Sequence, residues 1–134
     1  MSKFIIDSTI WIDFFKGKNK AVNNFLLPLI EEDKIYYNGI ILSELLIGAA
    51  NNKEFSFLKN NFEGFKHLKT DKNIFTQTSQ IGFRLRKKGY TIPLTDLIIA
   101  AHAIYYDLTI VTADSHFKLI NKNIRLKLQF LRFN

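Results

Sequence analysis

The alternation of short apolar runs with longer helical segments predicts a doubly wound α/β fold, in which helices cover both faces of a parallel sheet. The chain has 134 residues, of which 47% are hydrophobic, so it can bury a substantial core without disulfides. No internal repeat or linker-like tract divides the sequence. We therefore expect one compact domain over residues 1–134 with a sheet of about five strands.

Runs of β-forming residues bounded by turn residues predict the strands of this sheet. The second of these runs, Lys-Ile-Tyr-Tyr, is followed by Asn38-Gly39, which marks the turn into a helix. The last run, at the end of the chain, is rich in Leu and Phe. The predicted strands cover residues 3–6, 34–37, 67–69, 108–112 and 128–133.

Segments with apolar residues three and four positions apart predict the helices. Ser8 and Thr95 are expected to cap two of them, because their hydroxyls can accept hydrogen bonds from free N–H groups of a first turn. Gly17 and Gly89 are expected to end two helices, and Pro28 predicts a kink or a break. The predicted helices cover residues 8–15, 21–32, 40–50, 54–65, 73–88 and 95–106.

Composition and charge exclude several classes of function. The chain has no cysteine, which rules out disulfide frameworks, thiolate zinc sites, iron–sulfur clusters and cysteine nucleophiles. No apolar run approaches the roughly 18 residues that a membrane span needs, so a cytoplasmic protein is expected. Nineteen Lys and Arg against twelve Asp and Glu give a formal charge of +7, which would attract RNA or an acidic partner protein.

Four acidic residues stand where a solvated surface charge is not the obvious explanation. Asp7 and Asp114 each follow a predicted strand, and ligands of parallel α/β sheets bind beyond those strand ends. Glu44 is flanked by isoleucines three and four positions away, which predicts that it lies on an apolar, inward face. Asp96 begins a helix whose same face continues with small and apolar residues.

Each acid taken singly also has an ordinary structural explanation. Asp7 can cap a helix after its strand, Asp96 can favour a helix dipole, Asp114 can belong to a turn, and Glu44 can be ion-paired. Together they are harder to explain, because carboxylates about 4 Å apart repel by roughly 4 kcal/mol per pair at an effective dielectric near 20. A cation would stabilise such a cluster. Oxygen ligands without cysteine favour Mg²⁺ or Mn²⁺ over zinc, and such ions serve phosphodiester chemistry.

The four acids lie in motifs whose order and spacing resemble those of VapC-type PIN-domain toxins. The motifs are IIDSTIWIDFF at 5–15, SELLIG at 43–48, TDLIIAAH at 95–102 and VTADSHF at 111–117. The resemblance implies a three-layer α/β/α sandwich with a parallel sheet of about five strands. It also implies a metal-dependent endoribonuclease that acts on RNA, self-associates as a homodimer and is silenced by a small cognate antitoxin.

The resemblance also implies roles for individual residues. Asp7, Asp96 and Asp114 would hold the metal ion, Mg²⁺ or its substitute Mn²⁺, and Glu44 would bind through a water or help to activate one. Thr112 would be a supporting hydroxyl that orients Asp114 or a metal-bound water, and Ser8 would help in a similar way. The sequence shows no departure at the four acids, so nothing indicates an inactive site.

Other polar and aromatic residues fit structural roles better. His102 lies about 120° around the helix from Asp96 and is expected to be packed or exposed, and His116 is not assigned a role. The basic residues 84–88 can favour the end of a helix dipole as well as contact RNA. Trp11, Phe14 and Phe15 are expected to be core residues, with part of their surface open to a dimer or antitoxin contact.

Two other classes of function fit the sequence less well. A receiver-type signalling domain would need paired acids after the first strand, where Asp7 is followed by Ser8. A haloacid-dehalogenase-like phosphatase would need an aspartate where Thr9 stands. A PIN-like nuclease that works in RNA processing outside a toxin system remains the main alternative.

Overall fold

The computed structural model describes residues 2–131, and its strands form one five-stranded sheet. The strands are β1 (Phe4–Ile6), β2 (Ile35–Asn38), β3 (Lys66–Leu68), β4 (Thr109–Thr112) and β5 (Lys127–Phe130). Their order is β3-β2-β1-β4-β5, and all neighbouring pairs are parallel. The chain therefore builds outward from β1 to one edge and then returns to the other side of β1. The crevice between β1 and β4 is the switch point at which parallel sheets bind ligands.

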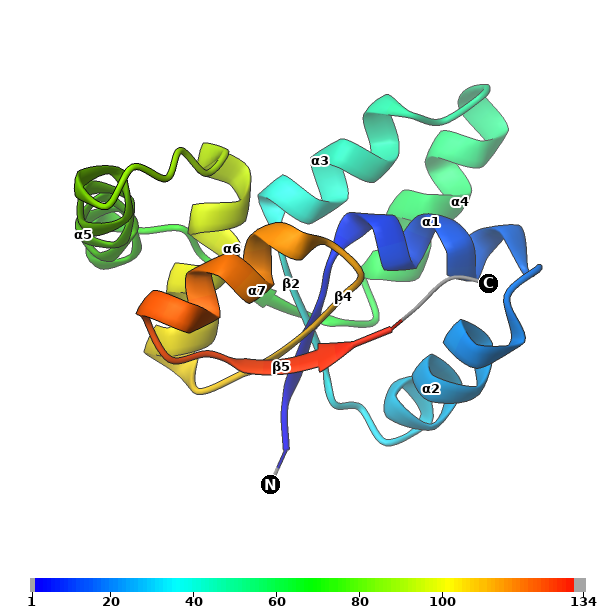
Figure 1. Cartoon of the computed structure of the whole chain (residues 1–134). Coiled ribbons are helices and arrows are strands. Elements are labelled where there is room, and N and C mark those ends of the chain that lie inside the picture. Colours follow the sequence, from blue (N-terminus) through cyan, green and yellow to red (C-terminus); the bar gives the residue numbers. More distant parts are fainter. Residues whose placement is uncertain (1, 132–134) are drawn as a thin grey trace.

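Helices cover both faces of this sheet, as the predicted α/β/α sandwich requires. They are α1 (Ser8–Lys16), α2 (Lys20–Glu31), α3 (Gly39–Ile47), α4 (Asn52–Phe62), α5 (Lys72–Lys87), α6 (Leu94–Tyr106) and α7 (Ser115–Asn123). In Figure 1, α5, α6 and α7 lie on one side of the strands, and α1, α2 and α4 lie on the other. The upper ends of β1, β2 and β4 lead directly into α1, α3 and α7, so three helices start from one edge of the sheet.

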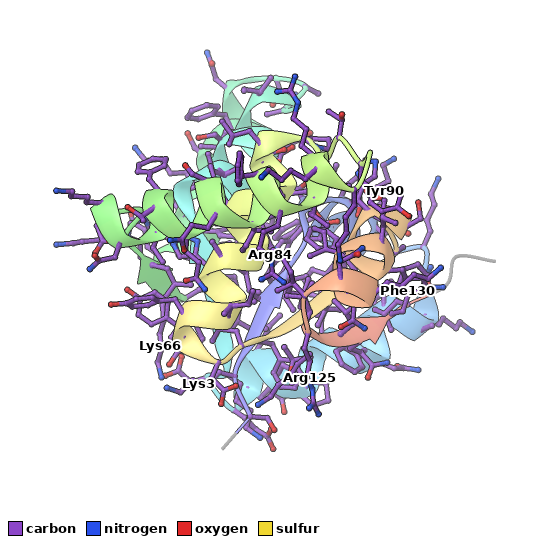
Figure 2. The ribbon with its side chains drawn as sticks, turned by 60° about the vertical axis from the view of Figure 1, so that its left-hand side comes forward. Lys3, Lys66, Arg84, Tyr90, Arg125 and Phe130 are labelled. Carbon is purple, nitrogen blue, oxygen red and sulfur yellow. The ribbon has the colours of Figure 1, made fainter. Side chains whose placement is uncertain are left out.

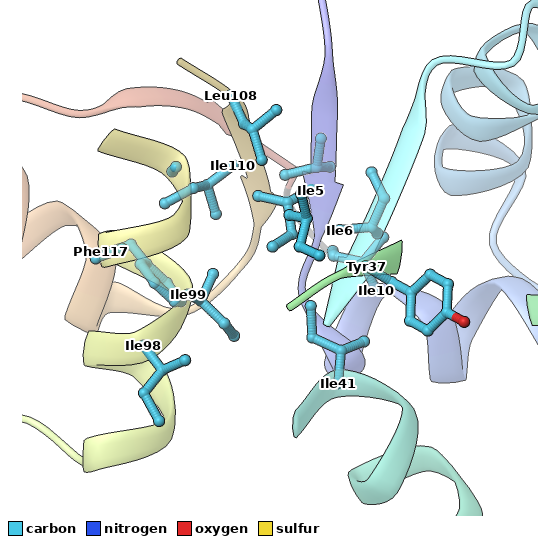
Figure 3. Packing of buried hydrophobic residues seen from close by; sticks show 14 of the residues in the cluster. Ile5, Ile6, Ile10, Tyr37, Ile41, Ile98, Ile99, Leu108, Ile110 and Phe117 are labelled. Atoms are coloured by element: carbon cyan, nitrogen blue, oxygen red, sulfur yellow. The ribbon is translucent and has the colours of Figure 1, made fainter. Parts of the chain in front are cut away.

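The core lies on both faces of the central strands. Ile5 and Ile110 of β1 and β4 are fully buried, and they pack with Ile99 of α6 and Phe117 of α7 (Figure 3). This burial on both faces explains why consecutive residues of each strand, Ile5 and Ile6 in β1 and Ile110 and Val111 in β4, are apolar. On the other side, the ring of Trp11 stacks on Phe65 with centroids 5.3 Å apart, and this contact joins α1 to the turn between α4 and β3.

The structure confirms the parallel sheet and all of the predicted strands and helices, with shifts of a few residues at their ends. The predicted last strand, 128–133, is β5, whose described part ends at Phe130; residues 132–133 lie outside the described range. Gly17, with φ of 69°, ends α1 as expected. The helix α7 was not predicted, because its few apolar residues follow an aspartate that was interpreted as part of a turn.

Three local predictions were wrong. Ser8 is the first residue of α1 and Asp7 occupies the cap position, although no side chain caps that helix. Thr95 lies inside α6, which begins after Pro93, because the fixed φ of proline suits the entry to a helix. The break that Pro28 predicted, as an alternative to a kink, does not occur, because α2 continues to Glu31; proline costs one backbone donor, but the apolar face of α2 still packs on the core.

The strand order also separates this fold from the receiver alternative. Receiver domains have the order 2-1-3-4-5, in which the chain reverses between the first and third strands. Here the reversal lies between β1 and β4, so the receiver interpretation is wrong. Within residues 2–131, no helix is both long enough and apolar enough to cross a membrane.

Candidate metal centre

Three of the four predicted acids meet at the switch point of the sheet. Asp7 follows β1 directly, and Asp114 lies two residues beyond β4, the neighbouring strand. Asp96 comes from the first turn of α6, which packs against β4. Asp7 is close enough to both other carboxylates that their charges raise its pKa. Acids that are distant in the sequence therefore share one site. For Asp7 and Asp114, the strand ends that they follow predicted this meeting.

Thr112 connects two of these acids through its hydroxyl. Its Oγ1 donates to Asp7 Oδ2 at 2.9 Å and accepts the backbone N–H of Asp114 at 3.0 Å. The side chain of Thr112 is fully buried, and Asp7 is only 4% exposed. A second hydroxyl, that of Thr9, also donates to Asp7 Oδ2, at 3.2 Å. The Asp7 carboxylate is thus held in a fixed orientation by two donors.

His116 joins the cluster, although sequence reasoning assigned it no role. Its Nδ1 lies 2.8 Å from Asp96 Oδ2 and 3.3 Å from Asp114 Oδ1. Its backbone N–H donates to Asp114 Oδ1 at 2.8 Å, so Asp114 caps α7. These contacts depend on α6 and α7 lying side by side. The sequence held one signal, the Asp-Ser-His spacing at a helix start, but the α7 helix itself was not predicted.

Glu44 occupies a different environment from the one predicted. The structure places its side chain at the surface, while Ile41 and Leu45 form the buried face of α3. The prediction of an inward face was wrong because α3 is apolar on almost every side, so the spacing of its isoleucines does not select a buried face. Ile47, one of the isoleucines that indicate an inward face for Glu44, is itself 85% exposed.

Glu44 still lies at the rim of the acidic cluster. Partial burial and the charges of Asp7 and Asp96 raise its pKa, and a hydrogen bond from the Ser8 side chain lowers it. Ser8 itself is buried at the start of α1. The four acids therefore belong to one electrostatic neighbourhood, with Asp7 at its buried end and Glu44 at its exposed end.

The electrostatics of this cluster favour binding of a cation. Burial is the main cause of the raised pKa of Asp7, and the charges of Asp96 and Asp114 raise it further. Burial also raises the pKa of Asp96, which the His116 hydrogen bond partly offsets. Partly desolvated carboxylates that repel one another are stabilised when a divalent ion neutralises them. Their oxygen atoms are the ligands that Mg²⁺ and Mn²⁺ use, so the residues fit such an ion.

His102 has a structural role, as predicted. It is completely buried, its Nδ1 lies 2.9 Å from Asn38 Nδ2, and its Nε2 lies 3.1 Å from the Lys69 carbonyl oxygen. Burial lowers its pKa, so the neutral ring accepts from Asn38 and donates to the Lys69 carbonyl. This histidine links α6 to β2 and to the end of β3, away from the acids.

A groove of about 500 Å³ opens beside Glu44, between α1, α3 and α4. Ile12 and Phe15 of α1 and Phe57 of α4 supply much of its apolar lining, and Glu44 lies in its wall. Trp11 is buried beneath this surface, whereas Phe14 and Phe15 are only partly buried. The expectation that the first-helix aromatics are mostly core with some open surface is therefore confirmed.

The basic residues labelled in Figure 2 do not form one cluster. Lys66 of β3, Arg84 of α5 and Arg125 before β5 stand apart from one another in this view. The predicted basic stretch 84–88 does end a helix, and its cations lie in the last turn of α5. Lys88 is also hydrogen-bonded to Asn123 of α7, at 3.0 Å.

Comparisons with known proteins match almost the whole chain. The PIN domain family model matches residues 4–123. Over 125 residues the chain is 32% identical to a protein named ribonuclease VapC from Rickettsia bellii (strain RML369-C), covering 83% of this chain and 84% of that protein.

Two solved structures share the fold along nearly their full length. One is VapBC2 from Rickettsia felis bound to a DNA fragment from their promoter, with a TM-score of 0.81 and 23% identity, covering 96% of this chain and 98% of that one. The other is DNA-bound VapBC from Salmonella typhimurium, with a TM-score of 0.82 and 23% identity, covering 97% and 98%.

Proposed function

Because the chain belongs to the PIN domain family, and to its VapC branch, we propose that it is a metal-dependent endoribonuclease acting as the toxin of a toxin–antitoxin pair. Residues 1–134 would form a single PIN-like domain. The observation that carries the proposal is the meeting of Asp7, Asp96 and Asp114 at the switch point between β1 and β4. The substrate is RNA, and the reaction is hydrolysis of its phosphodiester bonds.

Asp7, Asp96 and Asp114 would hold the divalent ion, Mg²⁺ or Mn²⁺, with Glu44 contributing through a water at the exposed side. When bound, such an ion lowers the pKa of water to give a nucleophile and stabilises negative charge on the phosphate oxygens. The protein's own part is to keep the carboxylates in place, and Asp7, buried and held by two hydroxyl donors, is the most rigid of them.

Three residues around the acids would support this site. Thr112 fixes the relative positions of Asp7 and Asp114 through its two hydrogen bonds. Ser8 would orient Glu44, whose carboxylate lies where an RNA strand can enter. Glu44 would accept a proton from a water at that entrance, and its raised pKa makes it a better base than an ordinary surface glutamate.

The groove beside Glu44 would receive the cognate antitoxin. Its apolar lining of Ile12, Phe15 and Phe57 suits an amphipathic segment, and Lys16 offers a partner for an acidic side chain. A segment seated there would lie next to the acidic cluster and block the approach of RNA. Because both RNA and antitoxin are found inside the cell, the protein would act in the cytoplasm.

Another apolar surface, on α5 and α6, would form a homodimer. Phe83 is 62% exposed and Leu94 is 63% exposed, and they border a groove of about 330 Å³ that includes Tyr90. Exposed aromatic and aliphatic side chains in one area mark a contact surface in proteins of this size. Association through α5 and α6 would leave the groove of α1, α3 and α4 free for the antitoxin.

Mapping of RNA cleavage tests the proposed activity. Purified protein is incubated with total cellular RNA in Mg²⁺, in Mn²⁺ or in EDTA, and new 5′ ends are sequenced. Discrete cuts that require both a metal and Asp7 are expected, and Asp7→Asn should abolish them while leaving the circular dichroism spectrum unchanged. Asp13→Asn, on the helix α1 that follows Asp7, is a matched control and should cut normally. Equal cutting by Asp7→Asn would overturn the metal role of Asp7.

The main alternative is a PIN-like nuclease that processes RNA outside a toxin system. The two differ in their effect on the cell, because a toxin arrests growth when it is expressed alone and is relieved by its antitoxin. Expression of the protein alone and together with a candidate antitoxin distinguishes them. A wild-type protein that cleaves RNA with its metal ion but does not arrest growth would favour RNA processing.

A further inference from the structure

His116 touches two acids of the cluster with a single nitrogen atom. Its Nδ1 lies 2.8 Å from Asp96 Oδ2 and 3.3 Å from Asp114 Oδ1. One ligand atom from each of these residues lies within 4.8 Å of the other two. The three residues come from the first turn of α6 and from the cap and first turn of α7, so two helix starts hold them together.

The spacing of these atoms is that of neighbouring ligands around one ion. Octahedral ions with ligands at about 2.1 Å separate adjacent ligand atoms by about 3.0 Å. The two nitrogen–oxygen distances, 2.8 and 3.3 Å, lie on either side of this value. Without an ion, Nδ1–H donates to the Asp96 carboxylate. When an ion takes the place of that proton, the neutral imidazole keeps its remaining proton on Nε2 and presents a lone pair at Nδ1, which makes it a metal ligand.

The backbone restricts where this imidazole can go. The N–H of His116 donates to Asp114 Oδ1 at 2.8 Å, which ties the start of α7 to the carboxylate that the ring also contacts. The ring therefore does not need to travel to reach an ion that binds Asp96 and Asp114. Its side chain is 40% exposed, so a ligand position beside it stays open to water or to a phosphate.

On the basis of the proposed function, we propose that His116 is a further ligand of the divalent ion, through Nδ1, and that it shifts the site's preference from Mg²⁺ toward Mn²⁺. Mg²⁺ is bound almost exclusively by oxygen, whereas transition ions accept imidazole readily. A site of carboxylates and one imidazole therefore gains more affinity for Mn²⁺ than for Mg²⁺. Without His116 the ligand set is all oxygen, and the preference for Mn²⁺ falls.

The decisive variant is His116→Asn. The asparagine amide can still donate a hydrogen bond from about the position of Nδ1, but only its oxygen can bind a metal, and an oxygen ligand brings no preference for Mn²⁺ over Mg²⁺. If His116 only positions Asp96 and Asp114, asparagine should preserve the preference of the site for Mn²⁺. If His116 is a ligand, asparagine should lose that preference as alanine does. His67→Ala is the matched control, because His67 is an exposed histidine on β3 outside the acidic cluster.

The experiment uses the full chain with Mn²⁺ or Mg²⁺ alone, without RNA. Calorimetry gives the affinity for each ion, and pulsed electron paramagnetic resonance of bound Mn²⁺ detects a directly coordinated ¹⁴N nucleus. We expect a ¹⁴N coupling in the wild type and in His67→Ala that is absent in His116→Ala and His116→Asn. We also expect Mn²⁺ affinity to fall about 10-fold or more in His116→Ala, and the ratio of Mn²⁺ affinity to Mg²⁺ affinity to fall in both His116 variants. Mg²⁺ affinity should change by less than about threefold, because water replaces the lost ligand.

The outcomes separate this inference from the proposed function. Mn²⁺ that binds the wild type without ¹⁴N coupling, or a wild-type preference for Mn²⁺ over Mg²⁺ in His116→Asn, overturns the role of His116 as a ligand and leaves the metal-dependent nuclease intact. A wild-type protein that binds neither ion overturns both. Asp96→Asn, which removes a proposed ligand from the same cluster, should lose affinity for both ions and confirms that the measured binding is at this site.

Discussion

At the scale of single residues, Thr112 is the side chain through which the ends of β1 and β4 are joined. One hydroxyl satisfies the carboxylate of Asp7 and the backbone N–H of Asp114, and it does so in a fully buried position. Thr112→Val keeps the shape and removes both hydrogen bonds. The free energy of unfolding should fall by about 1–3 kcal/mol, the usual result of leaving buried polar groups unpaired.

RNA cleavage by Thr112→Val should fall about 10-fold or more, because the hydroxyl that holds Asp7 and Asp114 in their relative positions is lost. Thr112→Ser restores the hydroxyl and should recover most of the activity. Thr109→Val, in the same strand, is the control for a general effect of valine in β4. Urea unfolding and the rate of cleavage of a mapped RNA measure the two effects. A Thr112→Val protein with normal cleavage would contradict a positioning role.

Asp7 makes the ion-free protein sensitive to pH. Burial raises its pKa above the ordinary value of 3.8, so the folded protein holds this proton more tightly than the unfolded chain does. The contribution of Asp7 to stability is therefore greatest below about pH 3.8, and this contribution is lost as the pH rises through the raised pKa. At pH 7 in EDTA, Asp7→Asn should melt at a higher temperature than the wild type.

Addition of Mn²⁺ should reverse this order. An ion that binds only the folded protein stabilises it, and the variant lacks a ligand. Differential scanning fluorimetry in EDTA and in saturating Mn²⁺ compares the two proteins directly. If the wild type were the more stable protein in both conditions, the buried Asp7 carboxylate would not be the destabilising group that its environment indicates.

At the scale of elements, His102 links strands and helices that are far apart in the sequence. Its ring lies between the Asn38 amide and the Lys69 carbonyl, and Asn38 Oδ1 in turn accepts the N–H of Ile41 at 2.9 Å and caps α3. One buried chain of polar contacts therefore sets the positions of β2, β3, α3 and α6. This arrangement brings Glu44 and Asp96 to the same edge of the sheet.

His102→Leu should lower the free energy of unfolding at pH 7.5 by about 1–3 kcal/mol, because it leaves the Asn38 amide and the Lys69 carbonyl unpaired. Burial lowers the pKa of His102 below its ordinary value of 6.5, so the wild type loses stability as the pH falls below 6.5. The leucine variant has no such loss. Urea unfolding should show a smaller difference between the two proteins at pH 5.5 than at pH 7.5. A constant difference would contradict a neutral, buried His102.

The elements also show what sequence patterns can and cannot predict. Asp7 and Asp114 were found because strand ends of a parallel sheet meet at one edge, a rule that needs no knowledge of side-chain contacts. The inward face of Glu44 was predicted wrongly, because a helix that is apolar all round gives no direction. His116 was missed because its partner Asp96 lies twenty residues away, and only the packing of α6 against α7 brings them together.

At the scale of the whole molecule, the acids at the switch point lie between two apolar surfaces. The groove of α1, α3 and α4 is lined by Phe57, which is 56% exposed, and the surface of α5 and α6 presents Phe83. These surfaces come from different helices and contain none of the same residues. If one receives the antitoxin and the other forms the dimer, each can be disrupted without the other.

Phe57→Glu and Phe83→Glu test this division, and each is the control for the other. Both phenylalanines are exposed, so a charge should not disturb the core, while a desolvated glutamate at either interface would be costly. Light scattering should find Phe83→Glu monomeric and Phe57→Glu dimeric. Copurification with a tagged antitoxin should be lost in Phe57→Glu and retained in Phe83→Glu. The reverse pattern would exchange the two surfaces, and loss of both properties in one variant would mean that dimerisation and antitoxin binding share a single face.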